Sequence, residues 1–403
     1  MVPMVLSKQL SIFLLFIVVS LVSFRAGGAE KAPEVNPFPV PTGLEPKIEF
    51  WKKVFTKYST RELVFYDSKN PSKIFKVMHI GKRRRIRSLV RRERMKIVRQ
   101  HGFKSRKRVW AQRGGKENFV LGMERSERYM EQFQAIFRER DLPAELAYLP
   151  LIESSFHLNA RSHAGAVGMW QLMRRTGKRY LRVTSTVDER KDPLESTRAA
   201  ASLLAENFDI FGNWPLAITA YNHGQNGIRR AVSRVGSDDL VEIINKYKSR
   251  RFGVSSKNFY AEFLAAVEVA KRDGDYFQDL EYHSPVKIAE LKLDQPISVS
   301  FLLRFTGVSR QQFFAWNPAL SKRIRIIPKW YRVKVPAEQL EVFAQAYQKA
   351  ITGPWVRHQV ARGETLSHIA NAYRTSIGEI QNFNGLSDVH LITVGQQLKI
   401  PRP

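Results

Sequence analysis

Apolar residues at helical spacing dominate the middle of the chain. Met130, Phe133, Ile136 and Phe137 recur at intervals of three and four positions, which predicts one buried face of a long helix. Further apolar runs predict three more helices, over residues 144–153, 195–207 and 256–271. Because no alternating strand pattern interrupts residues 118–275, this block is predicted to be an all-α domain with its own core.

The pattern changes after residue 275. Residues 283–336 and 356–401 each combine short β-prone runs with a helical middle, and Asn317 in the first segment aligns with Asn384 in the second. Each segment ends in a strand-like run before a proline, RVKVP in the first and LKIP in the second. We interpret the two segments as an internal repeat of a small α+β module, degenerate in its first copy.

Residues 1–29 have the layout of an export signal. Lys8 precedes an apolar run from Leu10 to Phe24, and small residues follow that run. We expect cleavage after Ala29. An uncleaved membrane anchor is the alternative, although the run is shorter than the roughly 20 residues of a typical membrane-spanning helix. Either outcome predicts an exported protein of the periplasm or cell envelope, which argues against nucleic acid as a partner.

Two further regions precede the helical block. Residues 30–46 contain five prolines and are predicted to be an extended linker. Residues 47–117 are polar and rich in helix formers, so they predict a basic helical region. Within it, residues 81–116 hold sixteen Lys or Arg and one acid, Glu93. This basic run is either a solvated helical face or a surface that contacts an anionic membrane or wall polymer.

Composition removes several classes of protein. The 403 residues are 43% hydrophobic and 26% charged, which is typical of globular domains and not of disordered or polytopic membrane proteins. The absence of Cys excludes disulfides, thiolate metal sites and a Cys nucleophile. The nine His lack metal-ligand spacing such as HExxH, so neither a metal nor a cofactor is expected. A formal net charge of +29 favours a polyanionic partner.

Glu153 is the first candidate for chemistry. It follows Leu149, Leu151 and Ile152 in the segment YLPLIESSFH. A carboxyl group between apolar walls has a raised pKa, so it stays protonated near neutrality and can donate a proton to a glycosidic oxygen. The alternative is an ordinary, water-exposed Glu at the end of a helix.

Two later motifs could bind a sugar. In SHAGAVGMWQLM (residues 162–173), two glycines allow close backbone approach and Gln171 offers an amide for hydroxyl or acetamido groups. Tyr221 and Asn222 follow an apolar helical stretch and precede Gly224. The alternative is that the tyrosine packs in the core and the asparagine ends a helix.

The order of these motifs resembles a known family. Glu153-Ser154, the SxxGAxGMWQ motif at 162–171 and AYNxG at 220–224 resemble the goose-lysozyme-like catalytic domain of soluble-type lytic murein transglycosylases, particularly the type D branch. The resemblance implies an all-α lysozyme-like fold in which Glu153 is the sole catalytic carboxylate. It also implies a set of residues that line the substrate cleft: Ser162, Gly165, Met169, Gln171, Tyr221 and Asn222.

The sequence departs from the family pattern at two points. Many members have Glu-Thr-Arg where this chain has Ser255-Ser256-Lys257, so no acid is assigned there. The alanine that usually follows the Tyr-Asn pair is His223.

The resemblance also implies a reaction. Glu153 would protonate the bond between N-acetylmuramic acid and N-acetylglucosamine, and the C6 hydroxyl of the muramic acid would then close on C1 to give a 1,6-anhydro sugar. Intramolecular attack of this kind lessens the need for a second protein carboxylate. Two alternatives remain open: a lysozyme-type hydrolase that admits water to C1, and a wall-binding scaffold that is catalytically silent.

The last segment, residues 356–401, resembles a LysM module. It carries a GETLSxIA opening, an Asn-Gly pair and a GQQLKIP ending. The resemblance implies a βααβ fold that binds N-acetylglucosamine polymers, and so peptidoglycan, through two loops. The loop residues expected to contact glycan are Gly363, Glu364, Thr365, Leu366, Leu391, Ile392 and Thr393.

Overall fold

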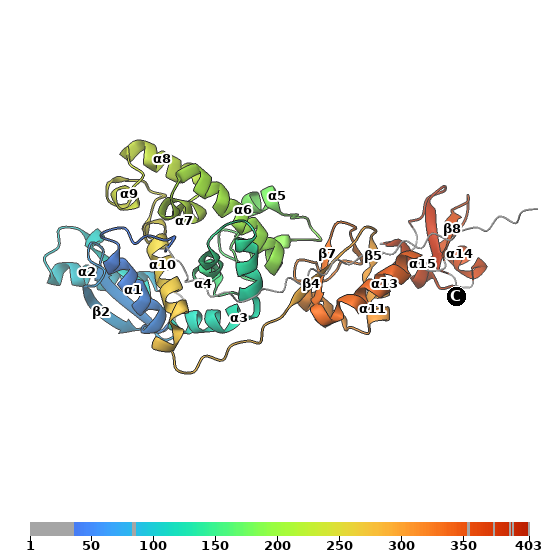
Figure 1. Cartoon of the computed structure of the whole chain (residues 1–403), viewed down its shortest axis with the longest axis horizontal. Helices are drawn as coiled ribbons and strands as arrows, with labels where there is room; N and C mark the ends of the chain where they lie inside the picture. The colour runs from blue at the N-terminus through green and yellow to red at the C-terminus, as the bar shows by residue number, and fades with distance from the viewer. Residues whose placement is uncertain are drawn as a thin grey trace, which may run out of the picture. The chain divides into compact units, whose positions relative to one another are not determined.

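The central block of the chain consists of packed helices, as the apolar spacing predicted (Figure 1). The computed structural model describes residues 36–401 apart from 83–85, 353–354, 374, 387 and 389–390. The elements of the central block are α3 (Lys116–Arg138), η2 (Ala144–Tyr148), α4 (Leu149–Ser154), α5 (Arg174–Tyr180), η3 (Glu189–Lys191), α6 (Pro193–Phe211), α7 (Trp214–His223), α8 (Gln225–Val235), α9 (Leu240–Lys246), α10 (Val254–Lys271) and η4 (Asp273–Asp275).

Trp170 lies at the centre of this helical core. Its indole ring is fully buried and packs within 6 Å, centroid to centroid, of the rings of Phe133 and Phe137 on α3. Its Nε1 donates a hydrogen bond to Thr197 Oγ1 on α6 at 2.8 Å, so the one polar atom of the ring is satisfied. Trp170 is therefore a core residue, and it fixes the loop of the second motif against α3 and α6.

The region from 47 to 117 is not only helical, and that prediction was wrong. It contains α1 (Glu45–Thr56), α2 (Arg87–Gln100) and η1 (Arg106–Arg108), together with the strands β1 (Glu62–Asp67), β2 (Ile74–His79) and β3 (Val109–Arg113). The strands form an antiparallel sheet in the order β2-β1-β3. The central strand β1 is buried on both faces and therefore reads as a continuous apolar run without the alternation that marks a half-exposed strand.

Residues 37–46 of the proline-rich segment are packed against the helical block, so this part is not a free linker. The Phe38 side chain is buried against the rings of Trp214 and Phe263. The backbone carbonyl of Pro39 accepts a hydrogen bond from the Tyr260 hydroxyl at 2.8 Å. These contacts anchor the segment to α7 and α10, and burial of the Phe38 side chain contributes about 1.5–3 kcal/mol.

Two modules that share the order strand, helix, helix, strand follow the helical block, and the first has two additional short strands. The first has β4 (Ile288–Lys292), β5 (Ile297–Ser298), α11 (Val299–Thr306), α12 (Arg310–Trp316), β6 (Ile326–Ile327) and β7 (Arg332–Pro336), and it is followed by η5 (Ala337–Gln339) and α13 (Leu340–Thr352). The second has β8 (Trp355–Gln359), α14 (Leu366–Ala372), α15 (Ile377–Asn384) and β9 (Gln397–Pro401). In each module the first and last strands pair antiparallel.

Asn317 and Asn384 make the same hydrogen bonds in the two modules. Asn317 Nδ2 donates to the carbonyl of Lys334 at 2.8 Å, and its Oδ1 accepts from the N–H of the same residue at 2.8 Å. Asn384 bonds the N–H and carbonyl of Lys399 in the same way, both at 2.6 Å. Each asparagine thereby ties the end of the second helix to the last strand, which supports the alignment of the two segments.

The predicted export signal, residues 1–29, lies outside the described residues. Within the part of the chain that the structure describes, no helix is both long enough and apolar enough to cross a membrane.

Candidate active site

Glu153 lies at the carboxyl end of α4, where the backbone turns sharply. Two residues that follow Glu153 closely, Ser155 and Phe156, have φ angles of 51° and 54°. These angles lie in the left-handed region that residues with a Cβ atom seldom adopt. The Ser154 hydroxyl donates to the Met169 carbonyl at 2.8 Å, and the Ser155 carbonyl accepts from Arg125 at 3.2 Å. These bonds hold a strained turn and thereby fix the position of the preceding carboxyl group.

Burial raises the pKa of the Glu153 carboxyl to about 8. Desolvation is the cause, because the carboxylate form loses hydration that the apolar surroundings do not replace. At neutral pH the group is therefore mainly protonated. This is the protonation state that a general acid needs before the reaction starts.

The loop of the second motif packs beside Glu153. Ser162 closes its start, because its hydroxyl accepts from the Ala166 N–H at 3.0 Å and its carbonyl accepts from the Gly165 N–H at 3.0 Å. Gly168 is required by its surroundings: a Cβ atom there would lie 1.8 Å from the Arg190 carbonyl oxygen. Gln171, with φ of 48°, turns its amide back so that Nε2 donates to the Gly168 carbonyl at 2.8 Å.

Tyr221 stands next to the candidate acid. Its hydroxyl donates to the Trp170 carbonyl at 2.7 Å, and burial, together with the Glu153 carboxylate, raises the pKa of the phenol well above its ordinary value. Asn222 is exposed, and its Oδ1 accepts from Ser256 Oγ at 3.2 Å. His223 Nδ1 lies 3.0 Å from the same hydroxyl, so Ser256 joins the third motif to α10.

The structure brings most of the predicted site residues to one region. The hydrogen bonds of Ser154, Gln171 and Tyr221 connect all three motifs through the backbone around Met169 and Trp170. The Met169 side chain is only 1% exposed and lies in the core, and its backbone carbonyl is the group that bonds Ser154. Contact of these residues with a substrate stays a prediction.

Comparison with known proteins identifies two domains in the chain. Residues 132–244 match the family model described as Transglycosylase SLT domain, and residues 358–401 match the one described as LysM domain. The chain carries an SLT domain and a LysM domain. The predicted class, a helical lysozyme-like domain followed by a small α+β module, is thus confirmed.

One curated relative aligns with most of the chain. Over 296 residues the chain is 28% identical to membrane-bound lytic murein transglycosylase D of Escherichia coli strain K12. The alignment spans 68% of this chain and 64% of the relative's length.

Two solved structures also align with part of the chain. The 70 kDa soluble lytic transglycosylase of Escherichia coli is 19% identical with a TM-score of 0.31, covering 39% of this chain and 27% of that one. The lytic transglycosylase Slt of Pseudomonas aeruginosa is 20% identical with a TM-score of 0.29, covering 38% of this chain and 25% of that one. At such TM-scores the assignment of the two domains rests on the sequence matches.

A second carboxylic acid, Glu262 on α10, lies near Glu153. Burial, followed by the like charge of Glu153, raises the pKa of Glu262 to about 8. Glu262 comes from α10, outside the three sequence motifs, and sequence reasoning missed it. The available signal was a lone acid within the otherwise apolar helical run FYAEFLAA.

Glu262 also lines a cavity of about 530 Å³ beside the candidate acid, which we call the Glu262 cavity. The walls are formed by α1, β3, the start of α3, α4 and the start of α10. Ile152 and Ser155, which flank the Glu153–Ser154 pair, belong to this lining. The N-terminal sheet region therefore contributes one wall of the space next to the site.

We predict that Glu262→Gln shifts the alkaline limb of the pH–rate profile to lower pH. Two neighbouring carboxyl groups titrate as a pair, and the charge of one delays ionisation of the other. Without the Glu262 charge, Glu153 loses its proton earlier, by on the order of one pH unit or less. The measurement is kcat/KM for glycan cleavage against pH.

The matched control is Glu268→Gln, which removes a carboxylate from the same helix α10 where it pairs with Lys52 at 2.8 Å. It should leave the pH profile in place. A Glu262→Gln profile identical to that of the unmodified protein would contradict the coupling, and a loss above roughly 100-fold at neutral pH would indicate a catalytic base.

Several of the predicted glycan-binding residues in the first loop of the LysM domain also stabilise the fold of the module. Thr365 Oγ1 caps α14, and the Leu366 side chain is 1% exposed in the module's core. Glu364 accepts from the Ala361 N–H at 2.7 Å and lies 2.8 Å from His358 Nε2. Gly363 has a φ of 84°, which favours glycine. These four residues shape the first loop. Glu364 and Thr365 are held there by hydrogen bonds to backbone N–H groups of the same module.

The second LysM loop is the more open one. Leu391 is 69% exposed, and Thr393 offers its hydroxyl beside Gln396. Ile392 is half-buried against the module's core. An exposed leucine next to polar groups is suited to contact the apolar face of a sugar ring. The second loop is therefore a better candidate for glycan contact than the first.

No metal centre emerges from the described residues, since no group of three or more His, Asp or Glu there is arranged to hold an ion.

Proposed function

We propose that this protein is a peptidoglycan lytic transglycosylase that cleaves between N-acetylmuramic acid and N-acetylglucosamine and holds the wall through its LysM domain. One observation carries the proposal: in an SLT domain, the Glu153 carboxyl is protonated at neutral pH and stands beside Tyr221. The relative named membrane-bound lytic murein transglycosylase D supports the same reading.

The reaction follows from this arrangement. Glu153 donates its proton to the glycosidic oxygen as the C1–O bond breaks, so the N-acetylglucosamine side leaves with a new hydroxyl group. The Glu153 carboxylate then accepts the proton of the muramic acid C6 hydroxyl as that oxygen bonds to C1. The acid is restored, no water is consumed, and the product end is a 1,6-anhydro sugar.

Glu262 bears on the hydrolase alternative. Hydrolysis by inversion requires an ionised carboxylate to activate water, and a retaining hydrolase requires one as nucleophile. Glu262 has a raised pKa of about 8, so near neutrality it is mainly protonated and a poor base. We therefore favour intramolecular attack by the substrate over attack by water.

Mass spectrometry of released sugars tests the reaction class. The purified chain is incubated with peptidoglycan, and products ending in 1,6-anhydro-muramic acid are expected. Products heavier by one water would make the protein a hydrolase. Absence of any product, with normal binding to wall material, would favour the silent scaffold.

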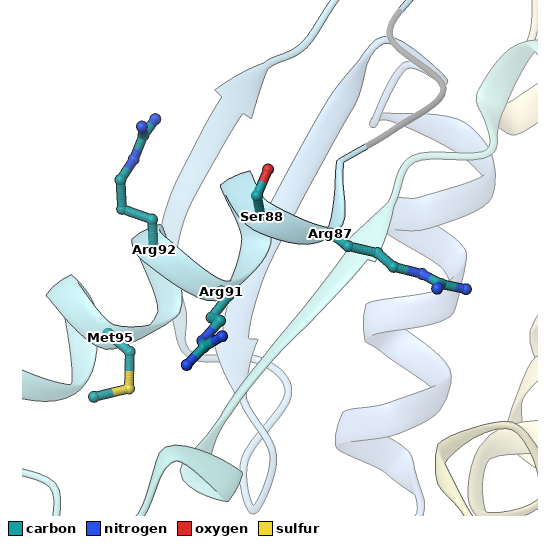
Figure 2. A pocket seen from close by; sticks show the side chains of 5 residues that line it. All are labelled: Arg87, Ser88, Arg91, Arg92 and Met95. Atoms are coloured by element: carbon teal, nitrogen blue, oxygen red, sulfur yellow. The ribbon is translucent and has the colours of Figure 1, made fainter.

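The envelope is the place where such an enzyme would act. The predicted export signal and the wall-directed domains support a periplasmic or envelope location. Arg87, Arg91 and Arg92 extend from α2 in different directions, with Ser88 among them and Met95 farther along the helix (Figure 2). These exposed cations could meet an anionic wall polymer or membrane surface, and both remain candidate partners.

The first repeat, residues 283–336, is proposed to be a LysM-like module. The element order and the shared asparagine hydrogen bonds support this assignment. Its last strand, β7, carries Lys334, which bonds acids of the SLT domain. We infer that this copy has a structural role.

Removal of residues 356–403 is predicted to weaken binding to the wall. The LysM domain adds contacts on the same polymer, and linked contacts raise avidity through local concentration. We expect the truncated protein to pellet at least about tenfold less well with purified wall sacculi. Cleavage of short soluble fragments should be unchanged, which is the internal control. Equal pelleting would remove the tether role.

A further inference from the structure

A small hollow beside the Glu262 cavity carries three cationic side chains and has no acid to neutralise them. It is lined by Arg94, Arg106, Lys107, Trp110, Ala111 and Val254 and has a volume of about 180 Å³. We call it the cationic pocket. Its residues come from α2, η1, β3 and the first residue of α10.

Arg94 is the part of this pocket that most needs a ligand. Its Nε is buried and has no hydrogen-bond partner among the described residues. Burial and the neighbouring Arg106 charge lower the pKa of the Arg94 guanidinium. Two cations therefore lie close enough there to repel each other. A buried donor without an acceptor is unfavourable, and an anion would relieve both the missing bond and the repulsion.

The nearby acids are already used or face elsewhere. Arg108, next in the chain, is neutralised by Asp67 at 2.7 Å, and Glu93 on α2 bonds Lys76 at 2.8 Å. Among the residues that the structure describes, no carboxylate pairs with the side chains of Arg106 or Lys107, both of which are exposed. The pocket thus has the exposed cations of Arg106 and Lys107 at one end and the half-buried Arg94 guanidinium at the other.

The cationic pocket adjoins the candidate active site. Val254 lines both this pocket and the Glu262 cavity, and β3 lines both as well, through Trp110 in one and Gln112 in the other. Tyr66 stands between the two ends: besides burial, Glu262 raises and Arg94 lowers the pKa of its phenol. A molecule in the Glu262 cavity can therefore reach the arginines at its rim.

We propose that the cationic pocket binds a carboxylate of the peptidoglycan stem peptide while the glycan strand occupies the site at Glu153. The inference rests on the proposed function, because the strand supplies the ligand. Guanidinium groups bind carboxylates through charge-assisted hydrogen bonds, and the Trp110 ring provides an apolar wall for the peptide. A flat membrane surface fits less well, since the key cation is half-buried in a hollow.

The test compares two substrates: peptidoglycan strands that carry stem peptides, and glycan strands from which the peptides have been removed. The main variant is Arg106→Ala/Lys107→Ala, which alters two exposed side chains and should fold normally. We expect kcat/KM to fall about tenfold on peptide-bearing strands and to stay unchanged on bare strands. Arg94→Met is the second variant, with the same expected pattern.

The matched control is Arg91→Ala/Arg92→Ala, which removes the same charge from the exposed face of α2 outside the cationic pocket (Figure 2). It should change the two rates equally, if at all. An equal loss on both substrates in the main variant, or the same selective loss in the control, would overturn the proposal. Loss of binding to anionic phospholipid vesicles without a change in substrate preference would assign the pocket to a membrane.

The two proposals can fail separately. If the unmodified protein cleaves neither substrate, the proposed function fails, and binding of the free stem peptide is then measured by titration calorimetry. Weaker binding to Arg106→Ala/Lys107→Ala than to the control, by about fivefold or more, still supports the pocket. Equal binding to both variants overturns it.

Discussion

Glu153→Gln is expected to reduce the release of 1,6-anhydro products by roughly 10²–10⁴-fold, the usual contribution of a general acid. Gln has nearly the same shape as a protonated Glu but has no proton to donate, so binding and fold should persist. Glu262, the neighbouring acid, lies on a different helix, α10, and lines the adjoining cavity, so we do not expect it to replace Glu153 as the proton donor. The measurement is the initial rate of product formation by mass spectrometry.

The pH dependence gives a second readout of the same residue. Burial raises the pKa of Glu153 to about 8, and the protonated form is the active one. The rate should therefore be level below that value and fall tenfold for each pH unit above it. A rate that rises with pH through this range would contradict the assigned role.

Glu131→Gln serves as the control for Glu153→Gln. Glu131 is exposed on α3, within the same domain but away from the site. It should keep the full rate and the same alkaline limb. Retention of more than about a tenth of the activity by Glu153→Gln would remove Glu153 from the role of sole acid.

Lys334→Met is expected to destabilise the protein by about 3–5 kcal/mol, the usual effect of breaking a buried ion pair. The Lys334 ammonium group is 1% exposed and lies 3.1 Å from Asp192, 3.2 Å from Glu195 and 3.1 Å from Glu290. Although burial lowers it, these carboxylates hold the pKa of Lys334 above its ordinary value. Methionine would leave the buried Asp192 carboxylate without its cation.

The cluster matters because it joins two parts of the chain. Asp192 caps α6 of the SLT domain, whereas Glu290 and Lys334 belong to paired strands of the first repeat. Arg198 on α6 adds a bond to Glu290 at 2.8 Å. Loss of Lys334 should therefore loosen the first repeat from the SLT domain as well as lower the midpoint of unfolding.

Lys399→Met is the matched control for Lys334→Met. Lys399 occupies the equivalent place in the second repeat and makes the same backbone bonds with its asparagine, but its ammonium group lies over the Trp355 ring at 4.8 Å. We expect a loss of at most about 1 kcal/mol, measured by chemical denaturation. Similar losses for the two variants would show that the acid cluster contributes little.

Local patterns were sufficient for much of the fold. The spacing of Phe133, Ile136 and Phe137 predicted α3, because one face of that helix is buried and its period is visible in a single stretch. Alignment of Asn317 with Asn384 predicted the repeat, because each asparagine performs the same bonding within its own module. The ordered motifs around Glu153 predicted a transglycosylase-type domain, and the SLT match to residues 132–244 confirms that domain.

Other features depend on contacts between distant segments, which leave no local signature in the sequence. The strand β1 was missed because burial on both faces removes the alternation that reveals a strand. The fixed position of Phe38 depends on partners in α7 and α10, far along the chain.

The sequence by itself determined the helical block, the repeat, and the residue proposed as the general acid. Only the tertiary structure decided the setting of that residue: the burial that raises the pKa of Glu153, the neighbouring Glu262, and the cationic pocket built partly by the N-terminal sheet. The reason is physical. Periodicity and motif spacing record interactions along one segment, whereas desolvation and charge proximity depend on which segments the completed fold brings together.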